Sequence, residues 1–336
     1  MQVEGVLKPG FGSFAASMSY ASVVGVTKGI DEARDFRDWF SANIKKVIAE
    51  PESSLGIGFL VGQRSSLPDE LDEQLRVVGL THIVVASGYN LTILVRLARK
   101  LFRRVSKYLT ALSGSLLIVG FILVTGFSPS MSRAGLVTGL SLAAWYYGRK
   151  VSPFVLLPLV AAITLLINPS YAWGDIGWYL SFSAFGGVMI LAPLLQHYFF
   201  GPKKPGFFRQ VLGETMAALL VTAPIIMLIF GQYSPYALLS NLLVVPLIPY
   251  IMLAVFAAGL ASAFVPALSL VASLPSSGLL QYVTSVVQWI AGLPGAQTEL
   301  NIGVAGLSFY YFCLGLTSFY LWRKTKHNFL GDNLVE

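Results

Sequence analysis

The stretch Gly79–Leu94, "GLTHIVVASGYNLTIL", places polar and helix-weakening residues inside an apolar segment that otherwise reads as a membrane helix. His82, Ser87, Gly88 and Asn90 all lie within nine positions of it. Each polar side chain is costly at membrane depth unless it meets a polar partner or water, and broken helices occur there only where they line a cavity or are buried in protein. The stretch therefore predicts a membrane helix beside a polar path.

The helical period separates two of these residues. On a continuous helix His82, Ala86 and Asn90 share one face because they are four residues apart, whereas Ser87 lies about 140° from His82. His82 and Ser87 therefore do not face each other as base and nucleophile. Gly88 follows Ser87, and the pair is expected to be a weak point where the helix kinks or unwinds. The alternative is plain packing, with Ser87 and Asn90 bonded between helices and His82 bonded to a backbone carbonyl.

The composition of the whole chain agrees with a membrane location. Of the 336 residues, 55% are hydrophobic and 12% are charged, about half the ~25% charged residues of soluble domains. One cysteine excludes a disulfide framework, and three histidines far apart in sequence argue against a zinc site. The sequence predicts no metal and no cofactor.

The fold class predicted is an all-α polytopic membrane protein with about nine transmembrane helices, some of them broken. The seventh and eighth spans contain Pro and Gly and are expected to be interrupted. The predicted spans are residues 79–97, 109–127, 132–148, 151–168, 178–198, 211–231, 236–262, 268–293 and 303–322.

Four regions are expected along the chain. Residues 1–30 are mixed in composition and show no signal peptide. Residues 31–78 hold an amphipathic helix and a charged lead-in, and residues 53–63 within them are too short to span. The helix, over 31–49, carries Trp and Phe on its apolar face, which is typical of an interfacial helix but also of one packed on protein. Residues 79–322 are the channel domain, and residues 323–336 are a basic tail.

Charge gives an orientation. Fourteen Lys and Arg residues follow spans 1, 3, 5 and 9, and the alternate loops hold none. By the positive-inside rule the N-terminal region lies outside and the C-terminus lies in the cytoplasm. Only two of the sixteen acids, Asp175 and Glu214, lie between residues 74 and 298. So few carboxylates do not suit a cation or proton transporter, and the excess of bases favours an anionic substrate.

The opening stretch resembles the signature of the ComEC competence family, Gly-Leu-x-His followed by an apolar run and Ser-Gly-x-His. Asn90 stands where most relatives have the second histidine. Three more segments resemble that family in order and spacing: "SPSMSRAGLVTGL" with Arg133, "INPSYAWGDIGWYLSFSAFGG" with Ser181, and "TAPIIMLIFGQYSPYALLSNLLVVPL" with Asn241.

The resemblance implies a channel in the bacterial cytoplasmic (inner) membrane that passes one DNA strand inward during natural transformation. It implies single-stranded DNA and membrane lipid as partners, together with a periplasmic DNA receptor and a cytoplasmic ATP-driven helicase or single-strand-binding protein. Residues 1–30 are interpreted as a remnant of the family's OB-like periplasmic domain. No His-x-His-x-Asp-His run is present, so the family's nuclease domain is expected to be absent from this chain.

No catalytic residue is expected. The predicted DNA path consists of His82, Ser87, Gly88, Asn90, Arg133, Asp175, Ser181 and Asn241. Arg133 would contact phosphates, unless it only extends its guanidinium to the membrane interface. Asp175 would pair with Arg133 or cap the helix that starts near Gly177.

Two other functions stay open at this point. One is an intramembrane hydrolase that uses Ser87, and the other is a small-molecule anion permease.

Overall fold

The computed structural model describes residues 2–9, 16–25, 31–63, 67–84, 88–102, 104–126, 128–149, 151–202 and 205–329. They form helices apart from two small antiparallel pairs of strands, β1 (Gln2–Pro9) with β2 (Ala16–Gly25) and β3 (Gln232–Tyr233) with β4 (Thr298–Glu299). The predicted all-helical membrane domain is confirmed in its class.

The helices before the midpoint of the chain are α1 (Glu32–Lys45), α2 (Glu52–Val61), α3 (Asp69–Val77), α4 (Thr81–Val84), α5 (Gly88–Phe102), α6 (Lys107–Thr125), α7 (Pro129–Tyr146) and α8 (Pro153–Ile167). Beyond it lie a 3₁₀ turn (Pro169–Trp173), α9 (Ile176–Gly186), a π-helical turn (Gly187–Leu191), α10 (Ala192–Phe200), α11 (Phe207–Phe230), α12 (Ala237–Val244), a second 3₁₀ turn (Val245–Leu247), α13 (Ile248–Phe264), α14 (Pro266–Ala291) and α15 (Val304–Thr325).

Among the described residues, six helical segments are long and apolar enough to cross a membrane: Lys107–Thr125, Ile176–Phe200, Phe208–Phe230, Ala237–Phe264, Pro266–Ala291 and Val304–Thr325. They coincide with predicted spans 2 and 5 to 9. The other three predicted spans fold as α4 with α5, as α7 and as α8. The number nine therefore stays a prediction.

The two predicted interruptions have different outcomes. The seventh span is broken, because a 3₁₀ turn with Pro246 separates α12 from α13. The prediction was wrong for the eighth span, where α14 runs through Pro275 as one helix of 26 residues. A proline removes only one helical N–H, and a helix tolerates that loss at membrane depth when neighbouring groups satisfy the freed carbonyl.

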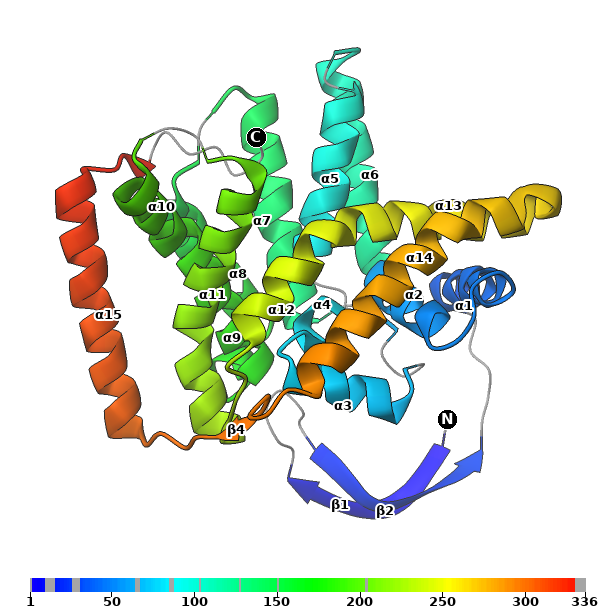
Figure 1. Ribbon diagram of the computed structural model, residues 1–336, viewed down its shortest axis with the longest axis horizontal. Coiled ribbons are helices and arrows are strands. Elements are labelled where there is room, and N and C mark those ends of the chain that lie inside the picture. The colour runs from blue at the N-terminus through cyan, green and yellow to red at the C-terminus, as the bar shows by residue number, and fades with distance from the viewer. Residues whose placement is uncertain are drawn as a thin grey trace.

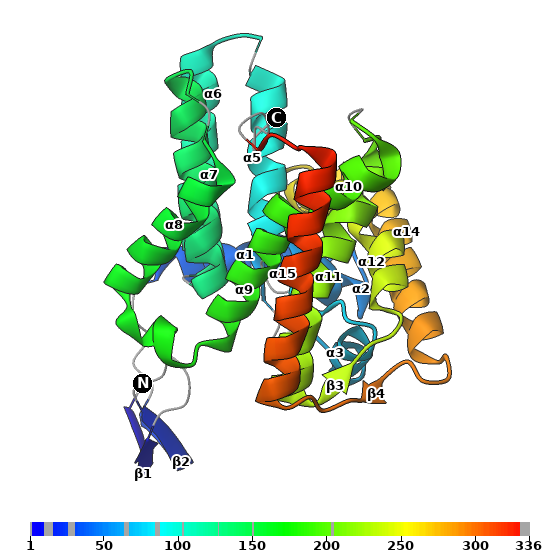
Figure 2. The same ribbon diagram turned by 90° about the vertical axis from the view of Figure 1, so that its left-hand side faces the viewer.

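The ends of the bundle differ as the charge pattern predicts. In Figures 1 and 2 the turn between α5 and α6 and the end of α15 lie at the upper end of the molecule, and these carry basic residues. The β1–β2 hairpin and the β3–β4 pair lie at the lower end. This arrangement fits an N-terminal region and a C-terminus on opposite sides, and which side is cytoplasmic remains a prediction.

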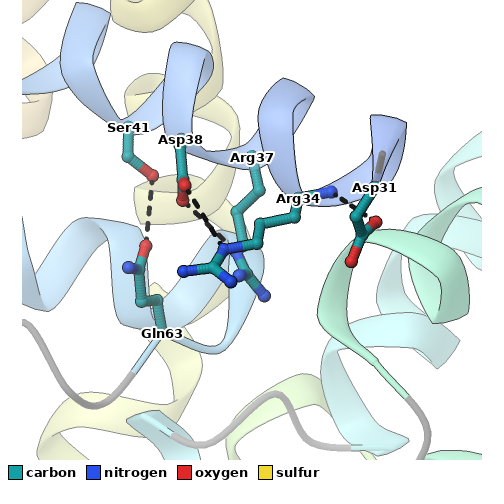
Figure 3. Close-up of polar contacts among 6 residues, drawn as sticks. All are labelled: Asp31, Arg34, Arg37, Asp38, Ser41 and Gln63. Atoms are coloured by element: carbon teal, nitrogen blue, oxygen red, sulfur yellow. Dashed lines mark hydrogen bonds and ion pairs between the residues drawn. The ribbon is translucent and has the colours of Figure 1, made fainter. Parts of the chain in front are cut away.

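The predicted amphipathic helix is α1, which packs on protein along one side, while a place at the membrane interface stays a prediction. Asp31 caps its start by accepting from the Arg34 amide at 3.1 Å, next to an exposed cluster of charged residues (Figure 3). Phe40 is buried and its ring centroid lies 5.8 Å from that of Phe256 on α13. Trp39, in contrast, is 43% exposed. One side of α1 thus packs on protein, and part of its aromatic surface is left for lipid or water.

Beneath α1 and α13 lies α2, which the sequence marked as too short to span. Every residue from Ser53 to Val61 is buried. Gly58 lies so close to Val84 that a Cβ there would be 2.5 Å from a Val84 methyl group. The segment is therefore a core helix that supports α4 and the start of the candidate path.

Candidate functional site

Arg133 lies on α7 and is held by residues of α9. Its side chain is buried, and its Nε donates a hydrogen bond of 2.6 Å to Oγ of Ser181. Ser181 in turn donates to Oγ of Ser130 at 3.3 Å. The guanidinium carbon also lies 4.9 Å from the ring centroid of Phe185, within cation–π range. Hydroxyl groups and an aromatic face therefore fix the cation between two helices.

Gly88 brings the first turn of α5 against this cation. A Cβ at Gly88 would lie 2.9 Å from Nη2 of Arg133 and 2.7 Å from Cβ of Ala134. Side chains larger than hydrogen do not fit at such distances. We call Gly88, Ser130, Arg133, Ser181 and Phe185 the Arg133 cluster. It unites three of the predicted path residues on three helices.

The cluster is positively charged and contains no carboxylate. In the described part of the chain the ion pairs lie between residues 34 and 76, and none involves Arg133. Its predicted partner Asp175 instead caps α9, where Oδ1 accepts from the Trp178 amide at 2.8 Å. The capping alternative is confirmed, and the pairing is not found, because the carboxylate is already engaged at a helix N-terminus. A buried guanidinium without a carboxylate needs water or an anionic ligand.

The opening stretch divides between two environments. Asn90 is fully buried and its Nδ2 donates to the Phe59 carbonyl of α2 at 3.0 Å. His82, on α4, is an exposed residue. The shared helical face of His82 and Asn90 stays a prediction, because residues 85–87 between them lie outside the described residues. Ser87 lies outside the described residues. The predicted weak point at Ser87–Gly88 therefore stays a prediction.

Asn241 does not join the Arg133 cluster. It is buried in α12, and its Nδ2 donates to the Ala237 carbonyl of the same helix at 2.7 Å. The neighbouring Ser240 links α12 to the carbonyl of Val78 at 2.7 Å. This part of the family-like segment therefore stabilises the packing of α12 against the end of α3.

The sequence reading missed a second group of cations and aromatic rings, at the other end of α7. The Arg99 guanidinium of α5 lies 4.7 Å from the ring centroid of Trp145, and Lys107 Nζ of α6 lies 5.9 Å from it. Lys107 also lies 5.5 Å from the ring centroid of Tyr146. These bases were interpreted mainly as topology determinants, with a secondary role in receiving an emerging phosphate backbone left open. One signal could have indicated these cation–aromatic contacts. Trp145 and Tyr146 end an apolar helix, and basic residues stand at the ends of the two preceding helices.

Two groups of residues thus pair cations with aromatic rings between helices. A model of the family described as "Competence protein" matches residues 59–325, which is most of the chain. The chain belongs to the Competence protein family, as the resemblance of its four segments indicated.

Two curated relatives give the range of similarity. "ComE operon protein 3" of Bacillus subtilis (strain 168) is 27% identical over 206 residues, which are 58% of this chain and 25% of that protein. An "Uncharacterized protein" of Aquifex aeolicus (strain VF5) is 24% identical over 221 residues, 65% of this chain and 51% of that protein. The chain thus matches a quarter to a half of the length of these relatives. No solved structure matches.

Proposed function

We propose that this chain forms a membrane channel through which one DNA strand crosses the bacterial cytoplasmic membrane during natural transformation. Membership of the Competence protein family supports a role in DNA uptake. The observation that carries the proposal is the Arg133 cluster, a buried cation without a carboxylate where three helices meet.

The geometry of Arg133 suits a phosphate. Ser181 accepts from Nε, and no described contact occupies the Nη donors that lie beside Gly88. A guanidinium binds phosphate through parallel N–H donors, and the bond is strongest where water is scarce. Asp175 and Glu214 are the two acids between residues 74 and 298, and Asp175 is engaged as the cap of α9, so few carboxylates oppose a phosphate along the path.

The second cation–aromatic group extends the path. Arg133 and Trp145 lie on α7 twelve residues apart, which is about 18 Å along a helix. Single strands are bound by basic grooves with aromatic rings on which bases stack. A strand that passes Arg133 could therefore meet Arg99, Lys107 and Trp145 next, on its way to the basic end of the bundle.

The remaining parts of an uptake machine are assigned to other chains. We infer that a receptor delivers DNA from outside and that an ATP-driven motor or a single-strand-binding protein receives it inside, since this sequence holds no phosphate-binding loop. We also propose that the chain moves its substrate without a chemical step.

Proteoliposomes test the proposal directly. Purified protein is reconstituted into liposomes, and a labelled single-stranded oligonucleotide is added outside. External nuclease then digests the oligonucleotide that has not entered, and the label protected inside the liposomes is measured. Arg133→Gln should abolish the protected signal, whereas Arg209→Gln should keep it. Arg209 is the matched control because its guanidinium lies over Phe200 at 5.0 Å, much as Arg133 lies over Phe185. Equal protection in both variants would refute the role of Arg133. Passage of small anions without oligonucleotide would indicate a permease.

A further inference from the structure

A pocket of about 850 Å³ lies between the start of α8 and the end of α15, at the same end of the bundle as the basic loops. Ser152 and Phe154 line one side. Trp322, Arg323, Lys326 and His327 line the other. Figure 2 shows the end of α15 beside α10, with the chain crossing from there toward the helices behind.

The segment that follows α15 fixes the pocket. Lys326 adopts a left-handed conformation with φ 50° and turns the chain away from the helix axis. Phe329 is then buried, with its ring centroid 5.0 Å from that of Phe154. His327 places Nδ1 3.4 Å from Nδ1 of His197 on α10. These two contacts hold the turn against α8 and α10.

The lining combines positive charge with apolar rings. Arg323 and Lys326 supply two cations, and no Asp or Glu is among the residues that line the pocket. Phe154 and Trp322 stay 52% and 45% exposed, so the floor is apolar and open at the side. Basic pockets of this kind between membrane helices attract phosphate-bearing head groups.

An apolar stripe on α15 leads to the pocket. Phe312, Leu316 and Phe319 are all more than half exposed, and they lie at the four- and three-residue spacing of one helix face. From Phe312 to Arg323 the helix rises about 16 Å, roughly half of the ~30 Å hydrocarbon core. An acyl chain of one leaflet that lies along this stripe would bring its head group to Arg323.

We propose that the pocket binds the phosphate head group of an anionic phospholipid, with the acyl chains on the apolar stripe of α15. The site is distinct from the DNA path and does not depend on it. A DNA strand would match the cations but would not use the stripe, which is why the lipid is the occupant that the surface favours.

Native mass spectrometry of the purified protein with phosphatidylglycerol tests this proposal. Arg323→Gln with Lys326→Gln should weaken binding about 30-fold, because each basic residue near an anionic surface accounts for about a fivefold change in affinity. The control is Arg96→Gln with Lys100→Gln, an equal change of charge at exposed positions of α5, which should bind as the parent does.

Three further results decide the nature of the ligand. Phosphatidylcholine should bind far less tightly than phosphatidylglycerol. Inorganic phosphate should compete weakly, because it lacks the acyl chains. Equal phosphatidylglycerol binding in both double variants would overturn the proposal. It would also be overturned if a short oligothymidylate displaces the lipid from the parent protein and no longer binds to the Arg323→Gln, Lys326→Gln variant.

Discussion

Gly88→Ala probes the contact between α5 and α7 on which the Arg133 cluster depends. The added Cβ would lie 2.7 Å from Cβ of Ala134 and 2.9 Å from Nη2 of Arg133. Non-bonded carbon atoms settle at about 3.5–4.0 Å, so the two helices must separate by about 1 Å or the guanidinium must leave its place. Overpacking of this kind costs about 1–3 kcal/mol.

Gly139→Ala is the matched control for this change, because Gly139 lies on α7 with open space around its Cα. There alanine should stabilise the helix by up to about 1 kcal/mol. Thermal unfolding in detergent should therefore place Gly88→Ala below the parent and Gly139→Ala at or above it. Oligonucleotide passage into liposomes should fall in Gly88→Ala alone. If Gly88→Ala is as stable and as active as Gly139→Ala, the proposed close contact with Arg133 is wrong.

Three further predictions concern other contacts. Asn90→Leu should destabilise the protein by about 1–3 kcal/mol, because it removes the donor to the buried Phe59 carbonyl. Asn90→His keeps an N–H donor and should unfold at a temperature closer to that of the parent. The reverse order of melting temperatures would contradict this interpretation. Tyr311→Phe should loosen α15 from α11 by about 1 kcal/mol, since the hydroxyl donates to an α11 carbonyl at 2.7 Å, and unchanged thermal unfolding would show that this bond contributes nothing. In a protein without its native cysteine, an impermeant thiol reagent added outside should label Thr298→Cys and spare Gly201→Cys, and labelling of Gly201→Cys would invert the proposed orientation.

The sequence predicted the helical class and several residues of the Arg133 cluster, but not which of these residues contact each other. Arg133 and Ser181 were selected because a cation and small hydroxyl residues are rare in apolar spans. Their bond joins residues 48 positions apart, and only tertiary packing brings them together. Gly88 was chosen as a weak point of its own helix, which stays a prediction, and the structure adds that it lies close to Arg133 and Ala134 of α7.

Other differences have local causes. Asp175 was expected either to pair with Arg133 or to cap a helix, and its carboxylate accepts from an amide at the start of α9. Asn90 and His82 are eight residues apart, and they share one helical face only if the helix between them is continuous. The helical period describes a single helix, and it cannot show which neighbour, here α2, covers one end of that face.

The central claim is that Arg133 meets an anion that crosses the membrane, and not a carboxylate of this protein. The most direct measurement is oligonucleotide passage into liposomes by the exchanged protein, Arg133→Asp with Asp175→Arg, next to Arg133→Lys. Because Asp175 caps α9 and forms no described contact with Arg133, the exchange should not restore passage. Arg133→Lys should reduce passage, since a lysine lacks the paired donors of the guanidinium. Full passage by the exchanged protein would contradict the account and leave Arg133 as half of a structural ion pair.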